Sequence, residues 1–181
     1  MRRAFSVDTY GINVAIGEFL REHKETPIFM YVHTIEPHQP YVPPGTMRVF
    51  SQRKGPGGMT DAYDNCILWA DANLGHTIEE LKRNGLWNNT LLIVTADHGE
   101  SLPEFDNGKQ GHGLEPFLAR VRIPLIMRLP EILPEGLVVN ENVEGLDITA
   151  TIFDLLHVER PAQFGGTSVL GLFDGYRKDE F

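Results

Sequence analysis

A carboxylate and an imidazole stand side by side in the sequence, directly after an apolar run. Asp97 and His98 follow residues 91–94, and Gly99 comes next. Both side chains are common metal ligands, and a glycine here allows a sharp bend and the close approach of a ligand. Aspartate and glycine are also ordinary turn residues. The triplet alone therefore leaves two alternatives open, a metal site and a plain exit from a strand.

A second cluster of polar side chains follows another apolar run. His33 comes directly after residues 28–32, and His38 follows a few residues later. In an open α/β sheet, chemistry gathers beyond the carboxyl ends of the strands. If both runs are parallel strands of one sheet, their ends share an edge. We then expect these histidines to converge with Asp97 and His98.

The composition limits the size of the fold and the kind of partner. The chain has 181 residues, enough for one domain or a large piece of one, and 41% of them are hydrophobic. Its formal net charge of −9, with no basic stripe, argues against a nucleic-acid partner. The single cysteine, Cys66, excludes an internal disulfide and is expected to be a buried small apolar residue.

Targeting signals are not visible in these residues. No run approaches the roughly 18 apolar residues of a membrane span. The first residues lack the apolar core of a secretion signal. No transmembrane segment is expected, and the compartment stays open between cytoplasmic and periplasmic.

Hydrophobic periodicity and turn residues divide the chain into alternating helices and strands. The predicted helices are 8–22, 60–83 and 148–156, the predicted strands are 28–33, 90–96 and 121–127, and a long irregular loop covers 36–58. Helix starts and stops follow from capping residues. The predicted caps are Asp8, Thr60 or Asp61, and Asp147, and the expected stop of the second helix is Asn84-Gly85.

The order of these elements predicts an α/β fold. A helix long enough for a crossover joins strands 28–33 and 90–96, which favours a mostly parallel sheet flanked by helices. Pro124 indicates an edge position, or a strand start, for the third strand.

Five stretches of the chain, in the right order, resemble the sulfatase family of the alkaline phosphatase superfamily. They are a strand with a His…Glu-Pro-His-x-Pro-Tyr loop (29–41), a long helix (63–75), a metal-binding strand (89–100), a Gly-His-Gly loop with the strand after it (111–128), and a closing helix with a glycine turn (147–168). The resemblance implies an alkaline-phosphatase-like fold and the metal-dependent hydrolysis of a sulfate ester.

One part of the family pattern does not match. The family's nucleophile is a cysteine or serine, converted to formylglycine, in a Cys/Ser-x-Pro-x-Arg motif near the start of the domain. Cys66 is followed by Ile67-Leu68-Trp69 and does not fit this motif. The family's other two metal-binding aspartates also lie upstream. Residues 1–181 are therefore expected to form a partial catalytic domain that lacks the N-terminal portion with the nucleophile.

The resemblance implies two metal ligands in this chain, Asp97 and His98. The family usually holds calcium, for which the oxygen of Asp97 is suited. The imidazole of His98 suits zinc or manganese better. The expected cofactor is thus a divalent metal, Ca²⁺ by resemblance, and formylglycine is expected only in the missing upstream portion.

The resemblance also implies catalytic and substrate-binding residues. His38 and His112 are expected to be catalytic, because N–H donors stabilise sulfate oxygens and a protonated imidazole supplies a proton to the leaving oxygen. Loop packing for His38 and a flexible linker around His112 are the alternatives. His33 and Lys109 are expected to bind substrate, against the alternatives of a packed histidine and a solvated lysine. Glu100 is expected to be a supporting or surface group.

Three functions follow from these observations. The first is a sulfuric ester hydrolase fragment acting on a small-molecule or glycan sulfate, inactive alone and open to association with a separate N-terminal half. The second is a phosphatase or phospho-group transferase of the same superfamily, which the missing nucleophile motif would distinguish. The third is a non-catalytic remnant or interaction module. An incomplete sheet is expected to expose an apolar edge, so aggregation or pairing is predicted as well.

Overall fold

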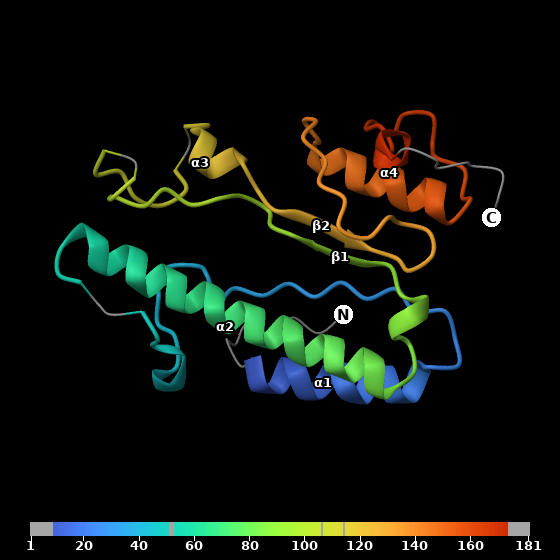
Figure 1. The fold of residues 1–181 in the computed structure, drawn as a ribbon, viewed down its shortest axis with the longest axis horizontal. Coiled ribbons are helices and arrows are strands. Elements are labelled where there is room, and N and C mark those ends of the chain that lie inside the picture. The colour runs from blue at the N-terminus through green and yellow to red at the C-terminus, as the bar shows by residue number, and fades with distance from the viewer. Residues whose placement is uncertain (1–8, 51–52, 106, 114, 174–181) are drawn as a thin grey trace. The chain divides into compact units, whose positions relative to one another are not determined.

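The computed structural model describes residues 9–50, 53–105, 107–113 and 115–173. Asp8, the predicted cap of the first helix, lies outside the described residues. Contacts within the chain separate two compact units, and the boundary along the sequence falls between Met127 and Arg128. Figure 1 labels the elements of both units. In the described residues we find no helix of the length and apolar character needed to cross a membrane.

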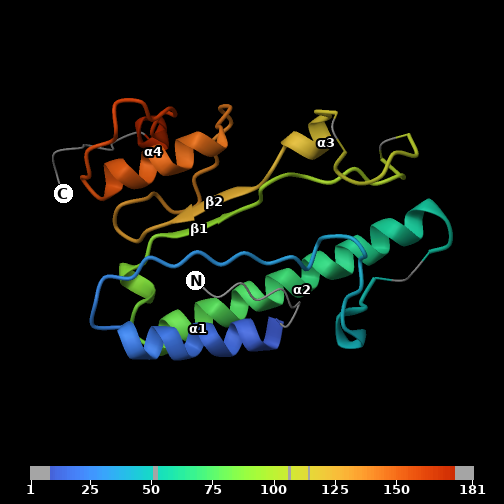
Figure 2. The ribbon, with the colours of Figure 1, turned by 180° about the vertical axis from the view of Figure 1, so that it is seen from behind.

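Two helices pack along each other in the first unit, α1 (Thr9–His23) and α2 (Pro56–Arg83), as Figures 1 and 2 show from opposite sides. Ile16 and Leu20 of α1 and Leu81 of α2 form a buried cluster between them. The helical spacing of these apolar positions predicted both helices.

The start of α2 differs from the prediction. Pro56 supplies the fixed φ that suits a first helical turn, so the helix begins earlier than expected. Thr60 and Asp61, the predicted caps, are therefore buried within the helix. The end is as predicted, since Asn84 is the C-cap residue and Gly85 has a φ of +73°.

Residues 28–33, predicted as a strand, run extended but belong to no sheet of the described chain. Ile28 and Met30 pack on the helix cluster, while Phe29 and Tyr31 are 82% and 77% exposed. The alternation of a strand is thus present. A strand also needs hydrogen bonds to a neighbour, which the sequence pattern does not report. In Figure 1 this segment runs in the same direction as β1.

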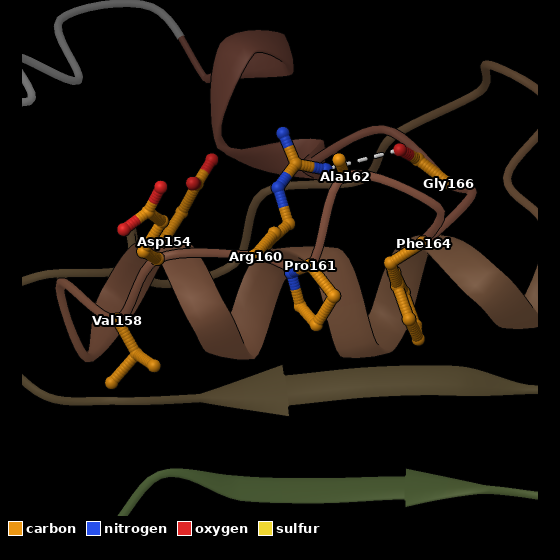
Figure 3. A pocket seen from close by; sticks show the side chains of 8 residues that line it. Asp154, Val158, Arg160, Pro161, Ala162, Phe164 and Gly166 are labelled. Carbon is orange, nitrogen blue, oxygen red and sulfur yellow. Dashed lines mark hydrogen bonds between the residues drawn. The ribbon is translucent and has the colours of Figure 1, made fainter.

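The sheet of the described residues has two strands, β1 (Leu92–Thr95) and β2 (Leu125–Arg128). Their arrows point in opposite directions in Figure 3. The hydrogen bonds agree with this direction. Thr95 bonds to Pro124, and Gly99, which comes after Thr95, bonds to Arg120, which comes before Pro124. The α/β class holds, but the predicted mostly parallel sheet is not confirmed.

Both strands of the sheet are shorter than predicted. α3 (Leu118–Val121) is a single helical turn that takes up the start of the predicted strand 121–127. β2 begins after Pro124, because a proline has no N–H for a sheet ladder. β1 likewise covers only the centre of 90–96, after a 3-10 turn at Trp87–Asn89.

The long loop 36–58 is anchored on α2. It contains a 3-10 turn at Gly45–Met47. The buried side chain of Asn65 accepts two backbone N–H groups of the loop, at 2.7 and 3.0 Å. Arg53 binds Asp61 through both its guanidinium and its backbone N–H, and this pairing lowers the pKa of Asp61. The loop that carries His38 is therefore tied to a rigid helix.

The second unit is built on α4 (Gly145–Leu155) and a 3-10 helix at Val169–Leu172. Thr151 of α4 is buried and accepts the first N–H of the 3-10 helix at 3.0 Å. The predicted cap Asp147 is wrong, because Glu144 is the N-cap residue. The Asp147 carboxylate stands at the third helical position and accepts the Glu144 N–H at 2.8 Å, which completes a capping box.

Candidate functional site

The residues after β1 are held in a fixed turn. Thr95 Oγ1 donates to the carbonyl of Pro124 at 2.9 Å, and the Gly99 N–H donates to the carbonyl of Arg120 at 2.7 Å. A Cβ atom on Gly99 would lie 2.2 Å from the carbonyl oxygen of Ala119, so a side chain does not fit there. The predicted ligand pair before this glycine therefore lies between two anchored points.

The segment that leads to His112 is closed by a short antiparallel bridge. Ser101 and Gly111 exchange backbone hydrogen bonds of 3.3 and 3.0 Å. Gly111 has a φ of +79°, in the left-handed region that favours glycine. Arg120 is buried and donates through Nε to Ser101 Oγ at 2.8 Å. This bridge returns His112 to the vicinity of His98.

Three histidine rings meet at this place. The ring centroid of His112 lies 4.2 Å from that of His98 and 5.1 Å from that of His38. His38 comes from the long loop, His98 from the end of β1, and His112 from the segment that the bridge closes. The structure thus brings together the segments around positions 38 and 98, which the sequence predicted to meet.

Each of the three rings directs its Nδ1 atom at an oxygen. Those of His38 and His98 lie 2.6 and 2.8 Å from the carbonyl oxygen of the next residue, and that of His112 lies 3.3 Å from a carboxylate oxygen of Glu100. A carbonyl oxygen only accepts hydrogen bonds, so the Nδ1 atoms of His38 and His98 carry the proton. Nε2 is then the nitrogen that remains for a ligand.

Glu100, expected to be a supporting or surface group, is part of this cluster. Its side chain is 6% exposed, and its Oε2 accepts the hydroxyl of Tyr41 at 2.9 Å. Tyr41 in turn packs edge-to-face on Tyr63 of α2. Burial raises the pKa of Tyr41, and the hydrogen bond to Glu100 adds to the shift. The place of Glu100 directly after Gly99, where two backbone segments pack closely, is the signal that could have indicated its burial.

Asp97 and His98 fit a metal ion in part. Asp97 Oδ2 lies 3.8 Å from His98 Nε2, and the two side chains are 69% and 39% exposed. Asp97 Oδ1 accepts the N–H of His98 at 3.0 Å, and the carbonyl contact of His98 Nδ1 is typical of metal-binding imidazoles. Across the described ranges, however, no three His, Cys, Asp or Glu side chains are grouped so as to hold an ion.

The two predicted substrate-binding residues have partners outside the three rings. The Nδ1 atom of His33 lies 3.3 Å from the hydroxyl of Tyr31, and His33 is exposed. Lys109 pairs with Glu115 at 3.2 Å and lies 3.7 Å above the ring of Phe117. The structure therefore does not join these two residues to the histidine cluster.

Two side chains that resemble parts of the family's nucleophile motif are both buried. Burial raises the pKa of the Cys66 thiol, which makes it a poor nucleophile. Ser101 and Pro103 have the spacing of the Ser-x-Pro-x-Arg motif, but Phe105 stands where the arginine belongs. The Ser101 hydroxyl is occupied by Arg120. Neither side chain is placed to attack a substrate.

A pocket in the second unit contains none of the predicted site residues. Its volume is about 500 Å³, and Figure 3 shows its lining, with Arg160 donating to the carbonyl of Gly166 at 3.1 Å. Asp154 and Phe164 line it as well. Because it holds no histidine cluster, the candidate site is the one in the first unit.

Comparisons with known proteins place the chain in a family. A model of the sulfatase family matches residues 12–158. The steryl-sulfatase of Rattus norvegicus is 26% identical over 156 residues, which are 80% of this chain and 26% of that protein. A phosphonate monoester hydrolase from Silicibacter pomeroyi is 31% identical with a TM-score of 0.61, covering 70% of this chain and 24% of that one.

The fold agrees with these matches. The crystal structure of Ps i-CgsB in complex with k-i-k-neocarrahexaose has a TM-score of 0.70 at 23% identity, covering 89% of this chain and 37% of that one. The chain thus spans about a quarter of the steryl-sulfatase and about a third of Ps i-CgsB. The family match extends over both the histidine cluster and α4. The chain belongs to the sulfatase family.

Proposed function

We propose that this chain forms part of a sulfuric ester hydrolase site, the part that binds the sulfate group and the leaving oxygen. The observation that carries the proposal is the meeting of three histidine rings, from three separate segments, beside Asp97. Membership of the sulfatase family supports the reaction type.

His38 and His112 are the proposed catalytic residues. Negative charge grows on the sulfuryl oxygens and on the leaving oxygen as the sulfur–oxygen bond breaks. Protonated imidazoles stabilise the former and supply a proton to the latter. Because Nδ1 of each ring lies against an oxygen, Nε2 is the atom that donates to the sulfuryl oxygens or to the leaving oxygen.

Asp97 and His98 are the proposed ligands of a divalent metal, with Ca²⁺ expected from the family. Such an ion, when bound, neutralises charge on the sulfate oxygens. Within this chain, Asp97 supplies a carboxylate oxygen and His98 supplies Nε2, which its carbonyl contact leaves without a proton in the neutral ring. The remaining ligands are proposed to come from outside the described residues.

The nucleophile is also proposed to lie outside this chain, as formylglycine in an upstream segment. A small-molecule or glycan sulfate is the proposed substrate class, which the glycan complex of Ps i-CgsB supports. His33 and Lys109 are proposed to contact the rest of the substrate. Lys109 would first have to leave Glu115.

A binding experiment tests this proposal on the chain itself. Titration with sulfate, followed by the imidazole signals in NMR spectra, should shift the signals of His38 and His112. His38→Gln and His112→Gln should each weaken the apparent affinity for sulfate about tenfold, which is ~1.4 kcal/mol. His76→Gln, an exposed histidine of α2, is the matched control and should bind as the wild type does. Equal responses of all three variants would contradict the proposal.

An activity assay tests the need for an upstream segment. The purified chain with Ca²⁺ should not hydrolyse a chromogenic aryl sulfate, because neither Cys66 nor Ser101 is accessible as a nucleophile. Activity should appear on mixing with an upstream fragment in which the cysteine or serine of the Cys/Ser-x-Pro-x-Arg motif has been converted to formylglycine. Turnover by the chain alone would show that the nucleophile lies within it.

A second candidate is the hydrolysis of a phosphonate or phosphate ester. The similarity to the phosphonate monoester hydrolase favours it, at 31% identity. Both kinds of ester present tetrahedral anionic oxygens to the same groups. Tighter binding of methylphosphonate or phosphate than of sulfate in the NMR titration would favour this reading. No binding of any of these anions would favour a non-catalytic interaction module.

A further inference from the structure

Glu100 is a buried acid that contacts one of the three rings and that the proposed mechanism does not use. We infer that Glu100 is a positioning residue, whose carboxylate holds the His112 imidazole with its proton on Nδ1 and leaves Nε2 for the ligand. This inference rests on the proposed function for its purpose, but the contact that it concerns is a property of the chain alone.

The direction of the hydrogen bond follows from the chemistry of its partners. An ionised carboxylate has acceptors only, so the 3.3 Å contact of Glu100 Oε2 with His112 Nδ1 requires a proton on the nitrogen. In the neutral ring Nε2 then holds a lone pair, and in the protonated ring Nε2 carries the second proton, which can be donated to a sulfate oxygen. His38 and His98 are fixed in the same way by backbone carbonyls. His112 differs because a side chain, not its own backbone, determines its tautomer.

Glu100 is itself held in one position. Its neighbours Gly99 and Ser101 are both bonded through their backbones, to Arg120 and to Gly111. Oε2 accepts the Tyr41 hydroxyl at 2.9 Å, so two donors converge on one oxygen. Oε1 is buried and accepts no hydrogen bond from the described residues. A carboxylate held in this way cannot rotate freely, and it therefore transmits its orientation to the His112 ring.

Tyr41 connects this contact to the loop that carries His38. The Tyr41 ring rests edge-to-face on Tyr63 of α2, with centroids 5.4 Å apart. The segment of His38 and the segment of His112 are therefore joined through one carboxylate oxygen. Loss of Glu100 should allow the proton of the neutral His112 ring to lie on either nitrogen and should leave the tautomer of His38 unchanged.

The test measures the tautomer directly, in the whole chain without any ligand. Long-range ¹H–¹⁵N spectra of the histidine-labelled protein, recorded into the alkaline range where imidazoles are neutral, distinguish a proton on Nδ1 from one on Nε2. We expect His112 to carry it on Nδ1 in the wild type. Glu100→Gln should preserve this state, because the amide oxygen still accepts. Glu100→Ala should convert His112 to the tautomer mixture of a solvent-exposed imidazole.

Tyr41→Phe is the matched control, since it removes the other hydrogen bond to the same oxygen. It should leave the proton of His112 on Nδ1. A proton on Nε2 of His112 in the wild type would overturn the inference, and this outcome does not depend on any variant folding. An unchanged tautomer in a folded Glu100→Ala variant would overturn it as well, since Glu100 would then only fill space.

Sulfate titration of the same samples separates this inference from the proposed function. If both hold, Glu100→Ala should weaken the sulfate response of His112 several-fold more than Glu100→Gln does. If sulfate binds nowhere while the tautomers behave as expected, the proposed function fails and the positioning by Glu100 stands. If sulfate binds but the neutral His112 ring carries its proton on Nε2, the positioning by Glu100 fails and the proposed function stands.

Discussion

Gly99 controls how closely the end of β1 approaches the chain before β2. Its N–H bonds to Arg120, and its missing side chain makes room for the carbonyl of Ala119. Asp97 and His98 lie immediately before this contact. The geometry of the candidate site therefore depends on a residue that has no side chain to bind a ligand or to react.

Replacement of Gly99 by alanine should destabilise the protein. The added Cβ would lie 2.2 Å from a backbone oxygen, which has to move, and forced overpacking of this kind costs about 1–3 kcal/mol. Urea denaturation measures the change in the free energy of unfolding. Gly75→Ala in α2 is the control, because nothing lies within 4 Å of its Cβ and it should stabilise the helix by about 0.5–1 kcal/mol. Equal effects of both substitutions would contradict the role given to Gly99.

The sequence predicted the site residues unevenly. His38 and His98 could be expected to meet because each follows an apolar run, and the structure brings them together through His112. Lys109 and His33 could not be placed, because short-range partners determine their positions and hydrophobic periodicity carries no information on them. For Glu100 the sequence left two alternatives open, a supporting group and a surface group, because its partner Tyr41 lies far away in the sequence.

At the level of elements, α2 is the support on which the long loop is built. Asn65 is fully buried in it and satisfies backbone groups of the loop at both its amide atoms. Arg53 ties the same loop to Asp61 of α2 and to Glu104. A loop of this length without its own ladder depends on such side-chain anchors.

Asn65→Ala should therefore loosen the loop. It removes the acceptor of the Val49 and Phe50 N–H groups, and the loss of a hydrogen bond costs about 0.5–1.5 kcal/mol net. The free energy of unfolding and the amide exchange rates of residues 49 and 50 measure the effect. Asn88→Ala, on an exposed asparagine, should change neither quantity. Protection of both amides in the Asn65 variant would show that the anchor lies elsewhere.

The cap of α4 should make the second unit sensitive to acid. Backbone N–H groups of Thr167 and Glu144 donate to Asp147 and hold the pKa of its carboxyl below its usual value. The stabilisation is thus complete above the ordinary aspartate pKa of about 3.9 and is lost as the pH falls through the lowered pKa of the folded state.

Asp147→Ala should cost about 1 kcal/mol of stability near neutral pH, because it removes one of the two side chains of the capping box. The difference from the wild type should shrink as the pH falls below the ordinary aspartate range. Chemical denaturation at a series of pH values measures it. The same denaturation series on Asp71→Ala, an exposed substitution in α2, is the control. A pH-independent difference for Asp147→Ala would contradict the capping role.

The elements themselves were predicted well where periodicity is long. The helices were recognised from their apolar spacing and the end of α2 from Asn84-Gly85, whereas the starts of α2 and α4 were wrong by a few residues. Asp147 and Glu144 both fit a capping box, so the sequence could not decide which is the cap. The pairing of the strands could not be predicted either, because strands of only four residues are too short for their apolar pattern to report the direction of a neighbour.

On the scale of the molecule, the first unit exposes large apolar side chains along its extended segment and on β2. Phe29, Tyr31 and Val32 are exposed along the extended segment, and Ile126 of β2 is exposed too. Exposed apolar segments with the alternation of a strand are templates for pairing with another chain. This surface agrees with a chain that spans about a quarter of the length of its steryl-sulfatase relative.

The isolated chain should therefore self-associate in a concentration-dependent way. Phe29→Ser together with Tyr31→Ser should reduce the association, because both side chains project from the extended segment. Sedimentation velocity at several protein concentrations measures it. Phe105→Ser removes an equally exposed aromatic outside this segment and should leave the association unchanged. A monomeric wild type at high concentration would contradict the expectation.

The bridge between Ser101 and Gly111 has a practical consequence. Their reciprocal hydrogen bonds close the base of the segment, and Gly108 near its tip already adopts a φ of +80° in open space. Extra residues spliced in beside Gly108 would lengthen the tip without altering the spacing between His98 and His112. A fluorescent label inserted at that tip should therefore report on ligand binding near the three imidazoles without changing their spacing.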